Sequence, residues 1–170
     1  MKRSSRAHRP IILFMFALLL LGLPAMLFAE SRADFSGSWF LDPTKGISNE
    51  MVLLMPILKI AQDDAAMTVS RSCGCPDTED SAWTDHYALD GSQAVSAAGN
   101  RTTQVSAAWT DDNRTLVVTT KTVAARAQGK SEIVLVDRYS LAEGGRVLEI
   151  DSTSTSPSGV DHALGIYNRN

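Results

Sequence analysis

The sequence predicts an all-β protein, an antiparallel up-and-down meander that closes into a barrel of about 8–10 strands behind a signal peptide. Three observations predict this fold. Apolar and polar residues alternate along short runs, which is the period of a half-buried strand. Clusters of Gly, Pro, Asn and Asp separate these runs at short, regular spacing. No long amphipathic helix can be placed after the leader. Closure into a barrel would also protect the edge strands of an exported chain.

Residues 1–29 have the composition of a secretory signal. Basic residues come first, an apolar core runs from Ile11 to Leu21, and Gly22 and Pro24 interrupt it. Cleavage after Ala29 is expected, with cleavage after Ala33 as the alternative. An uncleaved membrane anchor is the competing interpretation, because the apolar stretch is about long enough to span a bilayer. The glycine and proline favour the signal.

The residues that follow the leader are acidic. Four of the 16 basic residues lie before the apolar core and all 19 acidic residues lie after it, so removal of residues 1–29 leaves 12 basic residues and a net charge of −7. Such a domain repels phosphate backbones, which argues against nucleic acid as a partner. We therefore expect one barrel domain over residues 34–170, secreted or periplasmic, with no stable membrane insertion after cleavage.

The first strand is expected at Gly37–Leu41, with a glycine two residues before Trp39. Glycine allows close backbone approach, and the indole can fill one end of a barrel. The other runs and their turn signals predict further strands, of which Gln93–Ala98 is the weakest. These are Ile57–Gln62, Met67–Ser72, Trp83–Asp90, Gln93–Ala98, Thr103–Trp109, Leu116–Arg126, Glu132–Leu141, Val147–Thr155 and His162–Arg169.

Several of these segments carry a family likeness: Phe35–Pro43, Tyr87–Gly91, Trp109–Asp112, Asp137–Leu141 and Tyr167–Arg169. Together they resemble small secreted bacterial lipocalin-like (calycin-type) proteins over about Asp34 to Asn170. Gly37-Ser38-Trp39 is similar to the G-x-W element of true lipocalins, in which the tryptophan closes the barrel floor and a late arginine packs across it.

The resemblance assigns the structural floor to Gly37, Trp39 and Arg169, with Arg138 as the second choice for the arginine. It implies a cup-shaped barrel that holds a small, mainly apolar molecule. If a cavity exists, its lining is expected from inward-facing strand residues. These are Tyr87, Trp109, Leu116, Val118, Ile133, Leu135 and Tyr139. The run that contains Met51, Leu53 and Met55 could be a lid or a core segment, because methionine adapts to varied apolar surfaces.

The two cysteines, Cys73 and Cys75, lie one residue apart in an expected loop. An oxidising compartment favours a disulfide between them. A soft-metal site and a redox-active or intermolecular thiol pair are the alternatives. His86 and His162 are the histidines that such a metal site could use. Two thiolates alone make an incomplete zinc site, so no metal and no cofactor is assigned.

No pattern of catalytic residues is found, and no enzymatic activity is expected. The adjacent carboxylates Asp63-Asp64 and Asp111-Asp112 fall in expected turns. The sequence therefore predicts an exported, non-catalytic protein that holds a small apolar or amphipathic ligand. The alternatives are a filled barrel that acts as a structural or interaction module of the cell envelope, and a soft-metal or redox protein.

Overall fold

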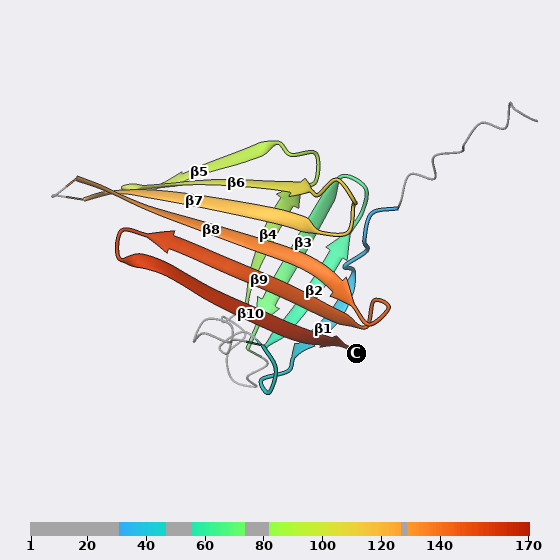
Figure 1. Ribbon diagram of the computed structural model, residues 1–170. Coiled ribbons are helices and arrows are strands. Elements are labelled where there is room, and N and C mark those ends of the chain that lie inside the picture. Colours follow the sequence, from blue (N-terminus) through green and yellow to red (C-terminus); the bar gives the residue numbers. More distant parts are fainter. Residues whose placement is uncertain (1–30, 47–55, 74–81, 127–128) are drawn as a thin grey trace, which may run out of the picture.

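The computed structural model describes residues 31–46, 56–73, 82–126 and 129–170. These residues form ten strands (Figure 1). Among them there is no helix long and apolar enough to cross a bilayer. The strands are β1 (Gly37–Leu41), β2 (Ile57–Gln62), β3 (Ala66–Ser72), β4 (Trp83–Ala88), β5 (Gln93–Ala98), β6 (Arg101–Trp109), β7 (Leu116–Arg126), β8 (Gly129–Ala142), β9 (Val147–Ser156) and β10 (Gly159–Arg169).

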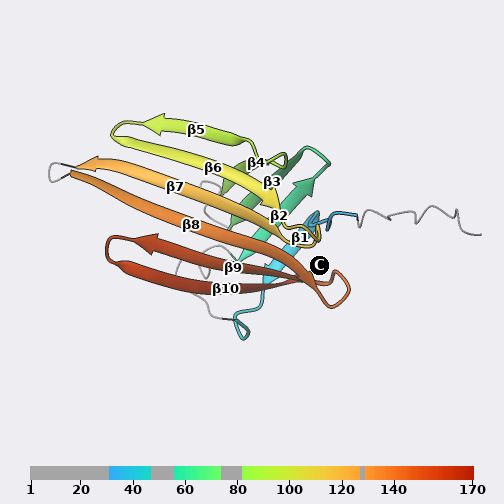
Figure 2. The ribbon, with the colours of Figure 1, turned by 45° about the horizontal axis from the view of Figure 1, so that its top comes forward.

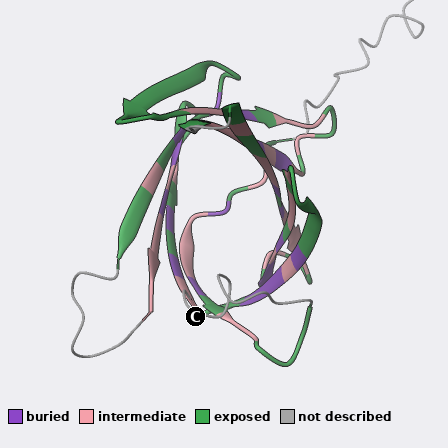
Figure 3. Ribbon diagram, turned by 90° about the vertical axis from the view of Figure 1, so that its left-hand side faces the viewer, coloured by how far each residue is buried: buried purple, intermediate pink, exposed green. Residues whose placement is uncertain are grey.

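One antiparallel sheet contains all ten strands, in the order β4-β3-β2-β1-β10-β9-β8-β7-β6-β5. The first and last strands pair, with Trp39 opposite Arg169, and this pairing bends the meander into a ring (Figure 3). β4 and β5 end the sheet without pairing to each other, and β4 lies near β6 at the seam. The prediction of an all-β, up-and-down, lipocalin-like barrel is confirmed, with the barrel nearly closed.

The two halves of the sheet differ in length. β1 to β4 have 5 to 7 residues, whereas β7 to β10 have 10 to 14. The short strands cross the long ones steeply, and the long strands extend beyond them toward the β7–β8 and β9–β10 hairpin tips (Figures 1 and 2). The short strands therefore cover the inner faces of the long strands at one end and leave them uncovered at the other.

Several strands are longer than their side-chain pattern predicts. β8 begins at Gly129 instead of Glu132, and β10 begins at Gly159 instead of His162. Backbone pairing up to the hairpin turn, such as Gly159 with Ser156, continues the ladder where the side chains no longer alternate. β4, in contrast, ends at Ala88 and not at Asp90, because a turn begins there.

Candidate ligand site inside the barrel

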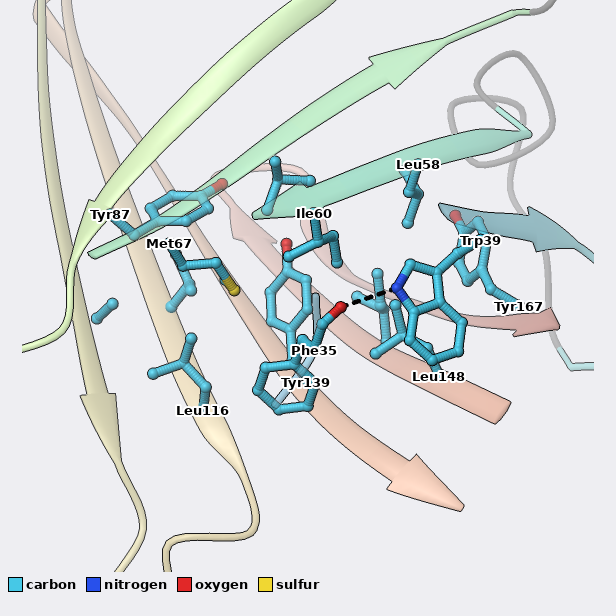
Figure 4. Close-up of a cluster of buried hydrophobic side chains, with 14 of the residues drawn as sticks. Phe35, Trp39, Leu58, Ile60, Met67, Tyr87, Leu116, Tyr139, Leu148 and Tyr167 are labelled. Carbon is cyan, nitrogen blue, oxygen red and sulfur yellow. Dashed lines mark hydrogen bonds between the residues drawn. The ribbon is translucent and has the colours of Figure 1, made fainter. Parts of the chain in front are cut away.

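The floor of the barrel is built around Phe35, which precedes β1 and is 0% exposed. Its ring stacks on Trp109 at a centroid distance of 5.7 Å and is tilted against Tyr139 at 6.1 Å. Its carbonyl oxygen accepts a hydrogen bond of 2.9 Å from Trp39 Nε1 (Figure 4). The segment before β1 thus closes one end of the barrel, together with the indole of Trp39.

Arg169 covers the outer side of this floor. Its guanidinium lies 4.6 Å from the centroid of the Trp39 ring, and its Nη2 donates to the Ser36 carbonyl at 3.1 Å. Such a cation–π contact contributes about 0.5–2 kcal/mol. A Cβ on Gly37 would lie 3.7 Å from Arg169 Nε. The φ of Gly37, 142°, is also one that residues with a side chain rarely adopt. Arg138, the second choice, is instead exposed on the outer face of β8.

Cross-strand partners form rows around the inner wall of β6 to β10, and burial decreases from row to row. The floor row contains Tyr139, Leu116 and Ile150, all buried. The next row contains Asp137, Val118 and Ala163, also buried. Beyond it lies the mouth of the barrel, defined as two rows that are half-buried or exposed. The mouth contains Val105, Thr120, Leu135, Ser154 and Asp161, and then Thr103, Thr122 and Ile133.

All seven side chains expected to line a cavity lie on the inner face, but they divide between floor and mouth. Tyr87, Leu116, Val118 and Tyr139 are buried in the packed floor half, and Trp109 is half-buried beside them. Leu135 is half-buried in the mouth, and Ile133 is 42% exposed there. Their role in ligand binding stays a prediction.

A charged pair lies inside the barrel, and neither of its residues was among the site residues predicted from the sequence. Arg71 on β3 forms an ion pair with Asp85 on β4, and its Nη2 donates to the hydroxyl of Tyr139 at 2.9 Å. Burial alone would lower the pKa of Arg71, but the surrounding tyrosines and Asp85 raise it, so the guanidinium stays charged. The positive charge of Arg71 is therefore already paired with the carboxylate of Asp85.

Asp137 lies at the boundary between the floor and the mouth, and only 8% of it is exposed. Burial raises the pKa of its carboxyl group, while the hydrogen bond from Ser152 and the charge of Arg71 oppose that change. Ser152 Oγ donates to Asp137 Oδ1 at 2.5 Å. A carboxylate can accept about four hydrogen bonds, so this one retains capacity for another donor.

All three tyrosines of the chain, Tyr87, Tyr139 and Tyr167, point inward and are buried. Burial raises the pKa of Tyr87 and of Tyr167 to about 12, and it raises the pKa of Tyr139 well above 10. They are therefore neutral hydrogen-bonding groups at physiological pH. Near them, Trp109 Nε1 is buried without a hydrogen-bond acceptor among the residues described.

Arg71, Asp85 and Asp137 carried a usable signal in the sequence. Each alternates with core residues: Arg71 follows Met67 and Val69 at a spacing of two, and Asp85 precedes Tyr87. A charged residue in phase with a buried face is expensive to bury unless it is paired. Alternation alone could have selected these residues, but their pairing depends on neighbouring strands.

The remaining predicted features are the lid, the cysteine pair and the two histidines. The lid residues Met51, Leu53 and Met55 and the cysteine Cys75 lie outside the described residues, so the lid and the disulfide remain predictions. Cys73 is half-buried just beyond β3. The histidines His86 and His162 are exposed, and each is hydrogen-bonded to a neighbouring threonine. Within the described ranges no three metal-binding side chains cluster.

A shallow groove of about 430 Å³ lies on the outside of the barrel. It crosses β8 to β10 and is lined mainly by polar side chains, among them Arg138, Glu149, Asp151 and His162. These residues alternate with the inward-facing ones, so the groove is separated from the interior by the sheet.

Comparisons with known proteins identify no family for this chain. No family model matches it, and no curated protein sequence matches it. Among solved structures it is similar to the zebrafish ileal bile acid-binding protein in complex with cholic acid, with a TM-score of 0.49 and 11% identity. The match covers 80% of this chain and 98% of that one. The fold described above rests on the strand pairing itself.

Proposed function

We propose that this protein is an exported, non-catalytic carrier that binds one small amphipathic molecule in the mouth of its barrel. The row-by-row loss of burial carries the proposal: a packed aromatic floor gives way to an uncovered inner wall. That wall combines apolar Val105 and Leu135 with small Thr and Ser side chains. Such a mixture suits binding by apolar contact with a few hydrogen bonds that set orientation.

Two features of the interior support a ligand over a solid core. The mouth residues remain half-buried or exposed even though they face inward, so a ligand there would remove apolar surface from water at about 25 cal/mol per Å². The Trp109 Nε1 donor has no acceptor among the described residues. An unsatisfied buried donor costs about 1–3 kcal/mol, and because Trp109 lies in the row of Leu116 and Tyr139, a water or a ligand group that reaches past the mouth is needed to recover it.

Export is supported by the composition of residues 1–29. Cleavage after Ala29 is favoured over cleavage after Ala33, because Arg32 and Ala33, which the second cleavage would remove, contact the barrel. The Arg32 guanidinium lies 5.6 Å from the centroid of the Trp109 ring. Ala33 N donates to the Asn113 carbonyl, and its own carbonyl accepts from Gln62. The mass of the exported protein, beginning at Glu30 or at Asp34, decides between the two sites.

The carrier proposal can be tested with an uncharged, environment-sensitive apolar dye such as Nile red. Thr120 faces the mouth, whereas Thr119 faces outward on the same strand. A Thr120→Trp substitution should weaken dye binding at least tenfold by filling the mouth, and Thr119→Trp should leave it within about twofold. Absence of saturable binding to the wild-type protein, or equal effects of the two substitutions, would contradict the proposal.

A further inference from the structure

We propose that the ligand carries a cationic polar end, an aliphatic or aromatic amine, which binds at Asp137 on the boundary between floor and mouth. This inference rests on the proposed function and names the chemical class of its ligand. Its basis is the placement of the charged side chains on the inner face of the barrel. A second basis is that the hydrogen bond to the Asp137 carboxylate from the described residues comes from the Ser152 hydroxyl.

The cation inside the barrel is not available to an anionic ligand. Arg71 is ion-paired with Asp85 and also donates to Tyr139. A ligand carboxylate would therefore have to compete with Asp85 for this largely buried guanidinium, or lie beside a second negative charge. Either arrangement is less favourable than binding to an unpaired guanidinium. The Arg71–Asp85 pair therefore selects against anions.

The mouth itself is acidic. Asp161 faces inward on β10, opposite Ser154, in the row next to the row of Asp137. Arg101 on β6 is also in phase with the inner face, but it lies two rows further out than Asp161, and Arg126 pairs with Gly129 further out still, at the end of β7. Among the described residues of the two mouth rows, the charged side chain is therefore the negative one of Asp161. A protonated amine complements it, and an alkyl or aryl body would contact Leu135 and Val105.

Asp137 is suited to hold the amine. Its hydrogen bond from the described residues comes from the Ser152 hydroxyl, so lone pairs remain for an N–H donor. Besides burial, the groups that influence its ionisation are Ser152, Arg71 and Asp85, and Tyr87, Tyr139 and Tyr167 are neutral neighbours whose own pKa values its charge helps to raise. Of these, only Arg71 is cationic. An ammonium at this position would replace lost hydration of the carboxylate and form a charge-assisted hydrogen bond.

The test compares three probes with the same eight-carbon chain: octylamine, 1-octanol and octanoate. Each probe is titrated into the full-length exported protein with Nile red bound, at pH 7 and low salt, and the displacement of the dye is measured. We expect octylamine to bind at least tenfold more tightly than octanoate, a difference of about 1.4 kcal/mol, with octanol between them. Asp137→Asn should bring octylamine to within about threefold of octanol, whereas the outer-face control Asp151→Asn should leave the order unchanged.

A second measurement uses the wild-type protein alone. Octylamine affinity should fall as the pH is lowered and Asp137 becomes protonated, and octanol affinity should not. Tightest binding of octanoate, no displacement by any probe, or an amine preference that persists in Asp137→Asn would overturn the inference while the carrier function stands. Failure of Nile red itself to bind would remove the carrier function and the inference together.

Discussion

Truncation of Phe35 tests whether the segment before β1 is the plug of the barrel. A buried Phe→Ala substitution costs about 3–5 kcal/mol, because apolar contacts are lost and a cavity remains. The Phe35 ring also stacks on Trp109, and such a pair adds about 0.5–1.5 kcal/mol. The segment is not in a strand and can relax toward the gap, so we expect a loss of about 4 kcal/mol. Phe40→Ala is the matched control, because Phe40 is 41% exposed on β1.

The two variants are compared by urea unfolding, followed by tryptophan fluorescence and circular dichroism. With a slope of about 2 kcal/mol/M, Phe35→Ala should lower the midpoint by about 2 M. Phe40→Ala should lower it by about 0.5 M or less, corresponding to about 1 kcal/mol. A difference between the variants below about 1 kcal/mol would refute the reasoning, because the segment would then not be packed in the floor.

Three further predictions concern ionisation and backbone geometry. Because burial raises the pKa of all three tyrosines above 10, the unfolded chain loses protons first, and stability should fall as the pH rises from about 10 to 12; absorbance titration at 295 nm should show no phenolate below this window while the protein is folded. Asp137→Asn should stabilise the protein at pH 7, because the raised pKa makes the ionised form unfavourable in the fold; this gain should disappear below about pH 4, and thermal unfolding at both pH values measures it. Gly46→Ala should destabilise more than Gly91→Ala, although both have φ near 80°, because a Cβ on Gly46 would lie 2.2 Å from the Leu164 carbonyl oxygen and one on Gly91 meets nothing within 4 Å; equal losses in urea melts would contradict this.

The fold was largely predictable because strand formation leaves a local trace. Alternation marked the segments, and Gly, Asp and Asn marked the turns. The bounds of β1, β2, β5 and β7 match the prediction. The errors lie at hairpin ends, as at Gly129, where backbone pairing continues without a side-chain signal.

The candidate site was less predictable. Alternation identifies the face of a residue but not its height in the barrel, so Ile133 and Tyr139 were grouped together although one is exposed and the other is buried. The partners of Arg71 come from two other strands, one of them 68 residues away in the sequence. No local pattern contains such a pairing.

By itself, the sequence determined which residues form most of the strands, which side of each strand faces inward, and that Trp39 lies in the first strand. These properties depend on neighbours along the chain. Only the tertiary structure decided that the long strands extend past the short ones, that one end is packed by Phe35, and that Arg71 and Asp137 lie inside. These properties follow from register and strand crossing, which are set by contacts between segments far apart in the chain.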